Sequence, residues 1–468
     1  PANGFESPAM EMAAKTWSGE WWKHGGGGHS WHGFTYDDEL DVLYIGTGNG
    51  SPWSHRIRSS GEGDNLFLCS IVALDPDTGE YLWHYQTTPG ESWDYNSSMD
   101  IVLADLEIKG ETVKALMHAP KNGFFYVINR ATGKLISAEK FADVNWASHV
   151  DIKTGRPVEL EGARYDKSSA FIMPGPTGAH TWHAMSYSPI TKLVYLPTTH
   201  SSIGMDDTEI PDDYANKSFD WGFGVNFTFT PPIRDYDGSL QAWDPVAQKA
   251  EWEIPQKTAH AAGTLVTSGG IVFQGAPDGV FYAYDASTGD TVWEYDAGLG
   301  ISAPAISYKI DGKQYISLLV GFGGGWANGN SNNSSLGWSY GIHKRRLITF
   351  SLAGDQKIPD QPPPFYPKPL VEKDFVVKKE LADMGAAVYQ RKGCWQCHGY
   401  EAPGAVSPYL PASPLTFSTM REGFAAVIRD GERAARGMPA FPDLSDEQLL
   451  SLTHYFRSVA NALADKSD

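Results

Sequence analysis

The stretch Ala73-Leu74-Asp75-Pro76-Asp77-Thr78-Gly79, with Trp83 four residues beyond it, sets the pattern of residues 1–350. An apolar strand leads into the Asp, which opens a tight turn, and the Gly supplies a positive φ before the next strand begins. The Trp then stands where it can pack flat between neighbouring sheets. Further copies occur at 242–248 with Gln248 for Gly and Trp252, at 283–289 with Trp293, and, without a Trp, at 127–133.

The spacing between copies falls within the blade period of β-propellers. Between the copies, apolar or alternating runs such as Val42–Ile45 and Phe124–Val127 indicate strands. Four recognisable copies over this length indicate long insertions or degenerate blades. We therefore predict an all-β propeller over residues 1–353.

The composition excludes several classes of partner. The 468 residues carry a formal charge of −19, which argues against binding to nucleic acid or to anionic lipid. Aromatic residues make up 13% of the chain and occur with 49 Gly and 30 Pro, a mixture that suits many short strands joined by tight turns. No apolar run approaches the roughly 18 residues that cross a bilayer.

The pattern changes after residue 353. Residues 354–372 hold the run QPPPFYPKP, which predicts an extended, semi-rigid linker. From 373 to 468 the periodicity is helical, and we expect one helix from Leu381 to Gln390. A second helix should begin at the capping box Ser445–Gln448, followed by one apolar stripe: Leu449, Leu452, Phe456 and Val459. The prediction is a small all-α domain.

The run CWQCH at 394–398 has the form C-x-x-C-H, the attachment signature of a c-type haem. Cys394 and Cys397 would bond the porphyrin edge, and His398 would bind the iron. Met438, in a loop with Gly and Pro, is the candidate sixth ligand, since a thioether suits an electron-carrying haem. A thioredoxin-like pair or half a zinc site is the alternative. The adjacent His, the lack of a second Cys pair and the downstream Met disfavour both. These residues predict a cytochrome c domain.

Covalent haem attachment also indicates a compartment. It implies the bacterial periplasm or an equivalent space, so we expect a periplasmic protein. No signal peptide precedes the sequence, and we expect a mature or truncated chain. The third cysteine, Cys69, lies in the apolar run 67–71 and is interpreted as a buried small hydrophobe rather than a reactive thiol.

A dinucleotide cofactor is disfavoured, because the Gly-rich runs at 25–28 and 323–325 lie between strands and open no βα unit. No flavin motif is evident either. Asn49, after an apolar strand, and Asp94, in an aromatic setting, offer hard oxygens of the kind that calcium binds. Two oxygens are too few for a site, and both residues have an alternative interpretation as ordinary turn residues.

A succession of motifs extends over essentially the whole chain: GGGGHSWHGFTYD, YIGTGNGSPW, GDNLFL, IVALDPDTGEYLWHYQ, WDY, APKNGFFYVINRATGKLISAEK, VNWASHVDIKTGRPVE and GCWQCH. This succession resembles the quinohaemoprotein alcohol dehydrogenases, which use pyrroloquinoline quinone (PQQ) and carry a C-terminal cytochrome c domain. The resemblance implies that the repeat is the family's tryptophan-docking motif. It also implies an eight-bladed propeller, of which this chain would hold the C-terminal part.

The resemblance also implies a reaction centre. Asp94 would be the catalytic base and would lie near calcium, for which Asn49 would be a ligand. In the related lanthanide enzymes an extra Asp stands two positions after the catalytic Asp; here that position is Asn96, which favours calcium. Trp31 would form the indole floor under the PQQ rings, and Lys121 would contact the quinone oxygens. Their alternatives are a plain core Trp and a solvated turn Lys.

Further residues would touch the margin of the cofactor. The resemblance implies that Asn145 and Trp146 contact its edge, and that Gly325 and Trp326 stand where the family's late Gly-rich loop approaches the PQQ carboxylates. His180 and His183 could suggest a metal pair, but their spacing on a strand–loop segment favours a structural role.

The sequence departs from the family in its first part. It begins shortly before Trp31, so the family's preceding blades are missing. With them are missing an adjacent Cys–Cys disulfide, a Glu calcium ligand and an Arg on the quinone. We therefore expect an N-terminal fragment or a second chain to complete the propeller, because an open propeller exposes unpaired edges.

The predicted function is oxidation of an alcohol to an aldehyde or ketone. Asp94 would take the hydroxyl proton while hydride moves to PQQ, with calcium polarising the quinone carbonyl. Electrons would then pass one at a time through haem c to a soluble cytochrome, a cupredoxin or a quinone-linked acceptor. Two alternatives remain. One is an electron-transfer or binding subunit with a cofactor-free propeller, and the other is a dehydrogenase for sugars, polyols or aldehydes.

Overall fold

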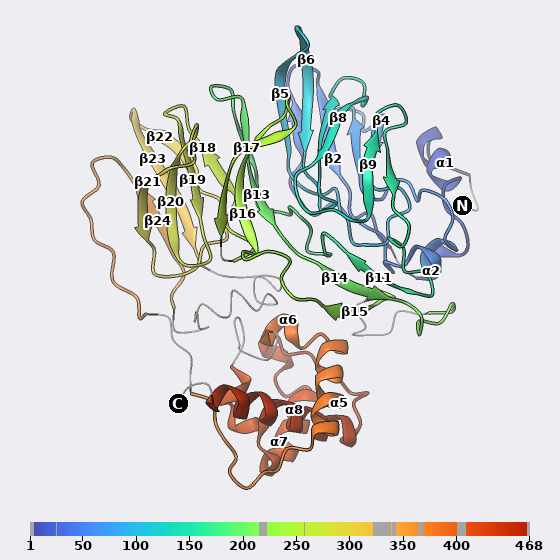
Figure 1. The fold of residues 1–468 in the computed structure, drawn as a ribbon, viewed down its shortest axis with the longest axis vertical. Coiled ribbons are helices and arrows are strands. Elements are labelled where there is room, and N and C mark those ends of the chain that lie inside the picture. Colours follow the sequence, from blue (N-terminus) through green and yellow to red (C-terminus); the bar gives the residue numbers. More distant parts are fainter. Residues whose placement is uncertain are drawn as a thin grey trace.

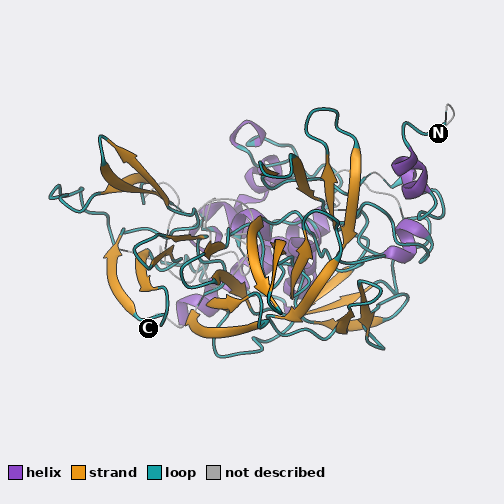
Figure 2. Ribbon diagram, turned by 90° about the horizontal axis from the view of Figure 1, so that it is seen from above, coloured by secondary structure: helices purple, strands orange, loops and turns teal. Residues whose placement is uncertain are grey.

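The computed structural model describes residues 4–24, 26–214, 222–256, 258–321, 338, 343–363, 368–399 and 409–465. Antiparallel sheets occupy the chain up to Phe350, and a group of helices follows from Lys379 onward (Figure 1). Seen from above, the helices lie beneath the sheets (Figure 2). In the part of the chain that is described, no helix is both long and apolar enough to cross a membrane.

Four sheets in the described residues are four-stranded antiparallel meanders, the unit of a propeller blade. The first contains β1 (Thr35–Asp37), β2 (Val42–Gly46), β3 (Ser70–Leu74) and β4 (Tyr81–Gln86). The second contains β5 (Ile101–Ile108), β6 (Glu111–His118), β7 (Phe124–Asn129) and β8 (Leu135–Lys140). The third contains β12 (Ser186–Ser188), β13 (Leu193–Thr199), β16 (Gly238–Asp244) and β17 (Lys249–Gln256).

The remaining blades follow in chain order. The fourth contains β18 (Thr264–Val266), β19 (Ile271–Gly275), β20 (Val280–Asp285) and β21 (Thr291–Asp296). A three-stranded sheet ends the series with β22 (Ile306–Ile310), β23 (Lys313–Val320) and β24 (Arg346–Phe350). The prediction of an all-β propeller, partial in this chain, is confirmed.

Smaller elements extend from the blades. Two short helices, α1 (Pro8–Ala14) and α2 (His55–Ser59), lie at the outer edge of the first blade (Figure 1). A two-stranded sheet pairs β9 (Ala147–Asp151) with β10 (Arg156–Glu159). A three-stranded sheet of β11 (Ser169–Ile172), β14 (Ile203–Asp206) and β15 (Asn226–Phe229) lies on the side of the blades that faces the helices (Figure 1).

The repeated turns have the predicted geometry. Oδ1 of Asp75 accepts hydrogen bonds from the backbone N–H groups of Asp77 and Thr78, at 3.0 and 2.8 Å. Gly79 has φ +74°, and Gln248, which stands for Gly in another copy, has φ +56°. Residues 151–155 form a further turn of the same kind, which the sequence comparison of copies did not include.

Tryptophan side chains join successive blades. A Cβ atom added to Gly133 would lie 2.6 Å from the Trp83 ring, so the ring of the first blade packs against the turn of the second. Trp252 packs in the same way on Gly289 of the next blade, where an added Cβ would lie 3.0 Å away. Packing of the repeat Trp between neighbouring sheets is therefore confirmed for these two copies. Trp293, in the fourth blade, is 41% exposed.

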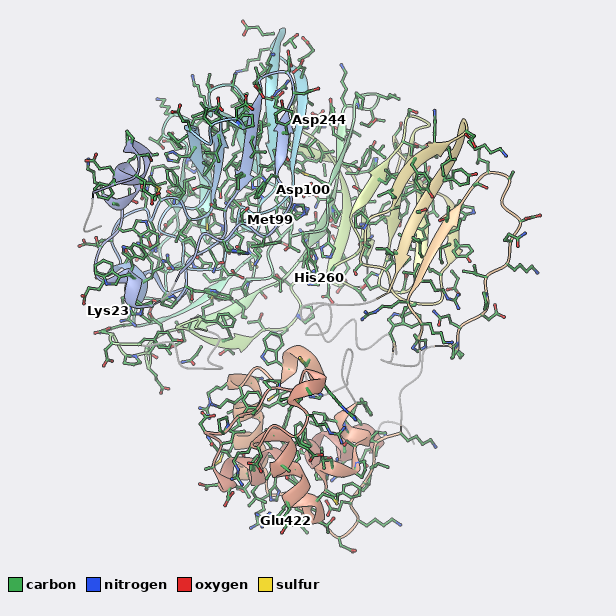
Figure 3. All side chains as sticks on the ribbon, turned by 180° about the vertical axis from the view of Figure 1, so that it is seen from behind. Lys23, Met99, Asp100, Asp244, His260 and Glu422 are labelled. Atoms are coloured by element: carbon green, nitrogen blue, oxygen red, sulfur yellow. The ribbon has the colours of Figure 1, made fainter. Side chains whose placement is uncertain are left out.

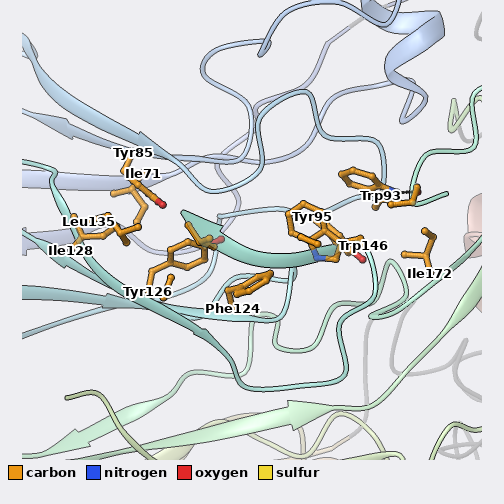
Figure 4. Packing of buried hydrophobic residues seen from close by; sticks show 14 of the residues in the cluster. Ile71, Tyr85, Trp93, Tyr95, Phe124, Tyr126, Ile128, Leu135, Trp146 and Ile172 are labelled. Atoms are coloured by element: carbon orange, nitrogen blue, oxygen red, sulfur yellow. Dashed lines mark hydrogen bonds between the residues drawn. The ribbon is translucent and has the colours of Figure 1, made fainter. Parts of the chain in front are cut away.

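A large aromatic core lies beside the first two blades. Trp93, Tyr95 and Trp146 are fully buried, with ring centroids 5.2 to 5.6 Å apart (Figure 4). Trp93 and Tyr95 belong to the loop between β4 and β5, so their packing on Trp146 anchors this loop. Each such side chain removes a large apolar area from water, and ring pairs of this kind add about 0.5–1.5 kcal/mol beyond their burial.

The C-terminal part is helical, as predicted. It contains α5 (Lys379–Arg391), α6 (Trp395–His398), α7 (Arg421–Ile428) and α8 (Asp446–Asp465). The capping box is present: the N–H of Gln448 donates to Oγ of Ser445 at 3.2 Å, and the N–H of Ser445 donates to Oε1 of Gln448 at 2.9 Å. The proposed linker, 354–372, lies between β24 and α5.

Candidate active site and haem-binding segment

Asp94 lies in the loop that joins β4 to β5, the connection between the first and second blades. Its backbone is left-handed, with φ +66°, and the side chain is only 9% exposed. A non-glycine residue in this conformation costs roughly 1–2 kcal/mol, so the surroundings must hold it there. Burial raises the pKa of Asp94 above its usual value, whereas the charge of Lys121 opposes that rise.

Both oxygens of the Asp94 carboxylate have a partner. Nζ of Lys121 donates to Oδ2 at 2.7 Å, and Nδ2 of Asn96 donates to Oδ1 at 2.8 Å. Lys121 is buried, so its alternative as a solvated turn residue is wrong. An added Cβ on Gly178 would lie 2.4 Å from Cγ of Lys121, and this glycine therefore allows the close approach that directs the lysine to Asp94.

Asn96 connects Asp94 to two other predicted residues. Its Oδ1 accepts the indole N–H of Trp31 at 3.2 Å and the backbone N–H of Asn49 at 3.0 Å. The structure thus brings together Trp31, Asn49, Asp94 and Lys121. The family resemblance implied for Asn96 only a role in metal preference. Its position two residues from Asp94 is the signal that could have suggested this further role.

Glycines of the segment 46–50 make this convergence possible. A Cβ atom on Gly46 would lie 2.0 Å from the carbonyl oxygen of Ser97, and one on Gly48 would lie 2.8 Å from Oδ1 of Asn96. Any larger residue would push the end of β2 away from the 94–98 segment. Gly46 is therefore explained by close packing on the Ser97 backbone, and Gly48 by its close approach to the Asn96 side chain.

Trp31 fits a stacking role for a planar cofactor. Its side chain is held at one edge by the hydrogen bond to Asn96, yet the residue is 39% exposed. A plain core Trp would be enclosed, as Trp93 and Trp146 are. With the Asp94–Lys121 pair beside it, the residues present fit a quinone that lies on the indole.

The calcium site is incomplete in the described residues. Asn49 Nδ2 donates to the carbonyl oxygen of Gly50 at 3.0 Å, so a calcium ion could take at most one amide oxygen from the Asn49 side chain, beside the Asp94 carboxylate. Calcium takes about six to eight oxygen ligands. No group of three or more His, Cys, Asp or Glu suited to a metal ion occurs in the described part of the chain. The residues present fit only part of a calcium shell.

Asn145 and Trp146 are occupied by contacts within the protein. The Asn145 side chain donates to the carbonyl oxygen of Phe171 and accepts from the N–H of Met173, at 2.8 and 2.7 Å. The Trp146 indole is fully buried and donates to the carbonyl oxygen of Asn122 at 2.9 Å. Their contact with a cofactor stays a prediction. Gly325 and Trp326 lie outside the described residues.

Three buried histidines, His180, His183 and His260, also occur in this part of the chain. His180 places Nδ1 2.6 Å from the carbonyl oxygen of Ala119 and Nε2 2.9 Å from that of His183, which agrees with the structural role expected for it. His260, with φ +63°, lies between the two groups of sheets (Figure 3). Burial and the charge of Lys121 lower the pKa of His260 to about 4. The sequence carried no signal for His260.

The haem-binding residues gather in the helical part. Cys394 and Met438 pack against one apolar cluster, in which the large buried members include Tyr389, Trp395, Phe424 and Phe456. His398, at the end of α6, is buried, and Cys397 is exposed. Burial raises the pKa of the Cys394 thiol to about 12, which indicates apolar surroundings of the kind a porphyrin edge requires. The residues present fit a c-type haem.

Comparisons with known proteins agree with this geometry. The family model described as glucose/ethanol/alcohol dehydrogenase, beta-propeller domain, matches residues 4–145 and 234–316. The family described as cytochrome C oxidase, cbb3-type, subunit III, matches residues 380–456. The quinohemoprotein alcohol dehydrogenase ADH IIB of Pseudomonas putida is 42% identical over 462 residues, which cover 98% of this chain and 66% of that relative.

Two solved structures are similar over nearly the whole chain. Quinohemoprotein alcohol dehydrogenase ADHIIG of Pseudomonas putida superimposes with a TM-score of 0.88 at 39% identity, covering 99% of this chain and 68% of that one. The enzyme of Comamonas testosteroni superimposes with a TM-score of 0.86 at 39% identity and the same coverage. The chain spans 66%, just under two thirds, of the length of the first two sequence relatives.

Proposed function

Because this chain belongs to the quinohaemoprotein alcohol dehydrogenase family, we propose that it oxidises an alcohol to an aldehyde or ketone and sends the electrons through haem c to an external acceptor. The observation that carries the proposal is the convergence of Asp94, Lys121, Asn96 and Trp31 at one place between the first two blades. A propeller that only docks a cytochrome has no need of a buried carboxylate–lysine pair beside a half-exposed indole.

In this proposal the residues of the chain have separate tasks. The Asp94 carboxylate accepts the hydroxyl proton of the alcohol. Burial and the ion pair with Lys121 keep this carboxylate in a fixed orientation. Lys121 balances the charge of Asp94 before that transfer, and the Trp31 indole provides the platform for a planar ring. PQQ, when bound, supplies a two-electron acceptor. Asn49 and Asp94 would contribute to a calcium shell that other residues complete.

The C-terminal residues would carry the electrons onward. Cys394 and Cys397 would attach the haem, His398 would bind its iron, and Met438 would be the sixth ligand. The acceptor is then a one-electron carrier such as a soluble cytochrome or cupredoxin, or a quinone-linked partner. Because attachment of haem c belongs to the periplasm or an equivalent space, we place the protein there.

The last sheet supports a proposal about completeness. Leu319 of β23 and Leu347 of β24 are paired neighbours, and they are 61% and 67% exposed. Ile306 of β22 is 59% exposed. Blades normally bury such residues against the next blade, so we propose that further polypeptide, an N-terminal segment or a separate chain, covers this sheet and completes the cofactor site.

The test separates a dehydrogenase from an electron-transfer subunit. The protein is purified with everything bound to it, acid-extracted, and the absorbance of released PQQ is measured. In parallel, the haem absorbance is followed after addition of a primary alcohol, a polyol, a sugar and an aldehyde. One PQQ per haem and haem reduction by the alcohol support the proposal. Absence of PQQ from the protein purified with its bound partners would favour the electron-transfer subunit. Reduction of the haem by the sugar alone would favour a sugar dehydrogenase.

A further inference from the structure

Glu91 is the most enclosed acidic residue next to the proposed active site, and the proposed reaction does not use it. The residue is fully buried. One of its carboxylate oxygens, Oε2, accepts hydrogen bonds from three backbone N–H groups: those of Trp93 at 2.8 Å, Asp94 at 3.0 Å and Tyr95 at 3.3 Å. The N–H in the middle of the three belongs to the residue proposed as the base.

This arrangement determines the backbone path at Asp94. Three consecutive N–H groups can point at a single oxygen only where the chain curves tightly around it. In such a curve Asp94 takes its left-handed conformation, with φ +66°. The same curve directs the Asp94 side chain away from Glu91 and toward Lys121 and Asn96. Hydrogen bonds to an ionised acceptor are roughly twice as strong as neutral ones, which suits this task.

A buried cation, Arg58, holds the main chain at Glu91. Arg58 is 1% exposed, and its Nη2 donates to the main-chain carbonyl oxygen of Glu91 at 2.6 Å. Nη1 of Arg58 donates to the carbonyl oxygens of Pro52 and Trp53, and Nε donates to Oδ1 of Asn65. Burial raises the pKa of Glu91 above its usual value, and the charge of Arg58 opposes that rise.

We propose that Glu91 is a positioning residue, which fixes the conformation and direction of Asp94 through the three N–H groups of residues 93–95. The inference rests on the proposed function, in which Asp94 is the base. Glu91 acts through the backbone and touches neither substrate nor cofactor. Its removal should therefore reduce turnover through misplacement of Asp94, while the protein still binds its alcohol and its haem.

The test uses two variants of the full protein, together with any partner chain that copurifies. Glu91→Gln keeps the volume and one acceptor oxygen but removes the charge, and Glu91→Leu removes the acceptor. Glu80→Gln, on an exposed turn, is the matched control, and Asp94→Asn is the reference for loss of the base. We measure kcat and KM for the alcohol, the haem spectrum, and amide hydrogen exchange of peptides covering 91–98 in the cofactor-free protein.

The expected results follow the number and strength of the hydrogen bonds. Glu91→Leu should lower kcat about 100-fold with KM changed less than about twofold, because misplacement of a reacting group acts on the chemical step. Glu91→Gln should lower kcat about threefold to tenfold, in line with weaker neutral hydrogen bonds. Exchange at the amides of residues 93–95 should accelerate in the same order, while Glu80→Gln should match the wild type in every measurement.

The outcomes distinguish this inference from the proposed function. If Asp94→Asn abolishes turnover while both Glu91 variants keep wild-type kcat and slow exchange, the positioning role is wrong. If Asp94→Asn also keeps its turnover, the assignment of the base fails, and the exchange data alone still decide whether Glu91 holds the loop. Should Glu91→Leu fail to fold, Glu91→Gln decides the matter, because it leaves the core volume intact.

Discussion

Nζ of Lys121 lies 2.7 Å from Oδ2 of Asp94, and each of the two side chains is only 9% exposed. Removal of either partner leaves a buried charge without compensation, which costs about 3–5 kcal/mol in well-enclosed pairs. Variants that preserve shape are therefore the informative ones at this site. In the proposed reaction, the pair defines the point toward which the alcohol presents its hydroxyl group.

Asp94→Asn is expected to retain bound PQQ and lose most of its turnover. The amide keeps the size of the side chain but cannot accept the hydroxyl proton, and loss of a general base typically costs about 100- to 10,000-fold in rate. The measurements are kcat with the alcohol and PQQ content after acid extraction. A variant with near wild-type kcat would remove Asp94 from the reaction.

Asn49→Ala is expected to weaken calcium binding. The substitution removes the side-chain oxygen but leaves the backbone N–H that donates to Asn96, so the framework around Trp31 should persist. Activity should fall in calcium-poor buffer and recover in part when millimolar calcium is added, because mass action compensates for a lost ligand. Activity that is indifferent to calcium at every concentration would exclude Asn49 as a ligand.

Met438→Ala is expected to remove the sixth ligand of the haem iron without loss of the covalent haem. The oxidised protein should lose the weak sulfur-to-iron band near the red end of its spectrum, because the thioether is the source of that band. His398 and the two thioether links should remain. An unchanged band would show that another residue supplies the ligand.

Gly133→Ala is expected to loosen the contact between the first two blades. The added Cβ would lie 2.6 Å from the Trp83 ring, so the free energy of unfolding should fall by about 2–4 kcal/mol. Gly110→Ala is the matched control, because Gly110 has φ +85° and nothing lies within 4 Å of its added Cβ. That control should lose only about 1 kcal/mol. Equal losses in urea-induced unfolding would rule out a docking role for the glycine.

Asp100→Asn is expected to change the pH dependence of stability. Burial raises the pKa of Asp100 from 3.8 to about 7, although nearby His32 favours the charged form. The folded protein binds this proton more tightly than the unfolded chain does, so the contribution of Asp100 is present at low pH and is lost as pH rises toward 7. Asn does not titrate.

The variant should thus resemble the wild type at about pH 4 and exceed its stability by about 2–4 kcal/mol at about pH 8. His180, whose Nε2 lies 3.8 Å from Oδ1 of Asp100, and His118, whose Nδ1 lies 3.1 Å from its backbone oxygen, face the same group. Urea unfolding followed by tryptophan fluorescence at both pH values is the measurement. A stability difference that does not depend on pH would contradict the prediction.

Local patterns in the sequence predicted the parts of the fold that depend on neighbouring residues. The Asp75–Gly79 turn and the capping box at Ser445 each involve groups within five residues, so their types and spacing suffice. The haem segment 394–398 is equally local. Packing of Trp83 was also foreseeable, because the repeat itself places a large ring after each turn.

Contacts between distant segments could not be predicted in this way. The hydrogen bond from Trp31 to Asn96 joins residues 65 positions apart, and it exists only because the fold brings the segment around Trp31 to the 94–98 loop. No sequence pattern identifies Glu91 as a positioning residue, because its hydrogen-bond partners are backbone N–H groups, which nearly every residue has. His260 reaches the surroundings of Lys121 through the curvature of the propeller, which the sequence does not express locally.

The side-chain amide of Asn96 has a direction, and this has a consequence for how the site can change. Its oxygen accepts from two N–H groups while its nitrogen donates to the carboxylate and to the main-chain carbonyl oxygen of Asp94, so a rotated amide would break all four contacts at once. Exchange of that nitrogen for oxygen, as in Asn96→Asp, would keep the two N–H contacts and set a second negative charge against Asp94. The hydrogen-bonded frame of this loop and the charge beside Asp94 are thus separable by a single functional group, so one substitution would change that charge without any redesign of the frame.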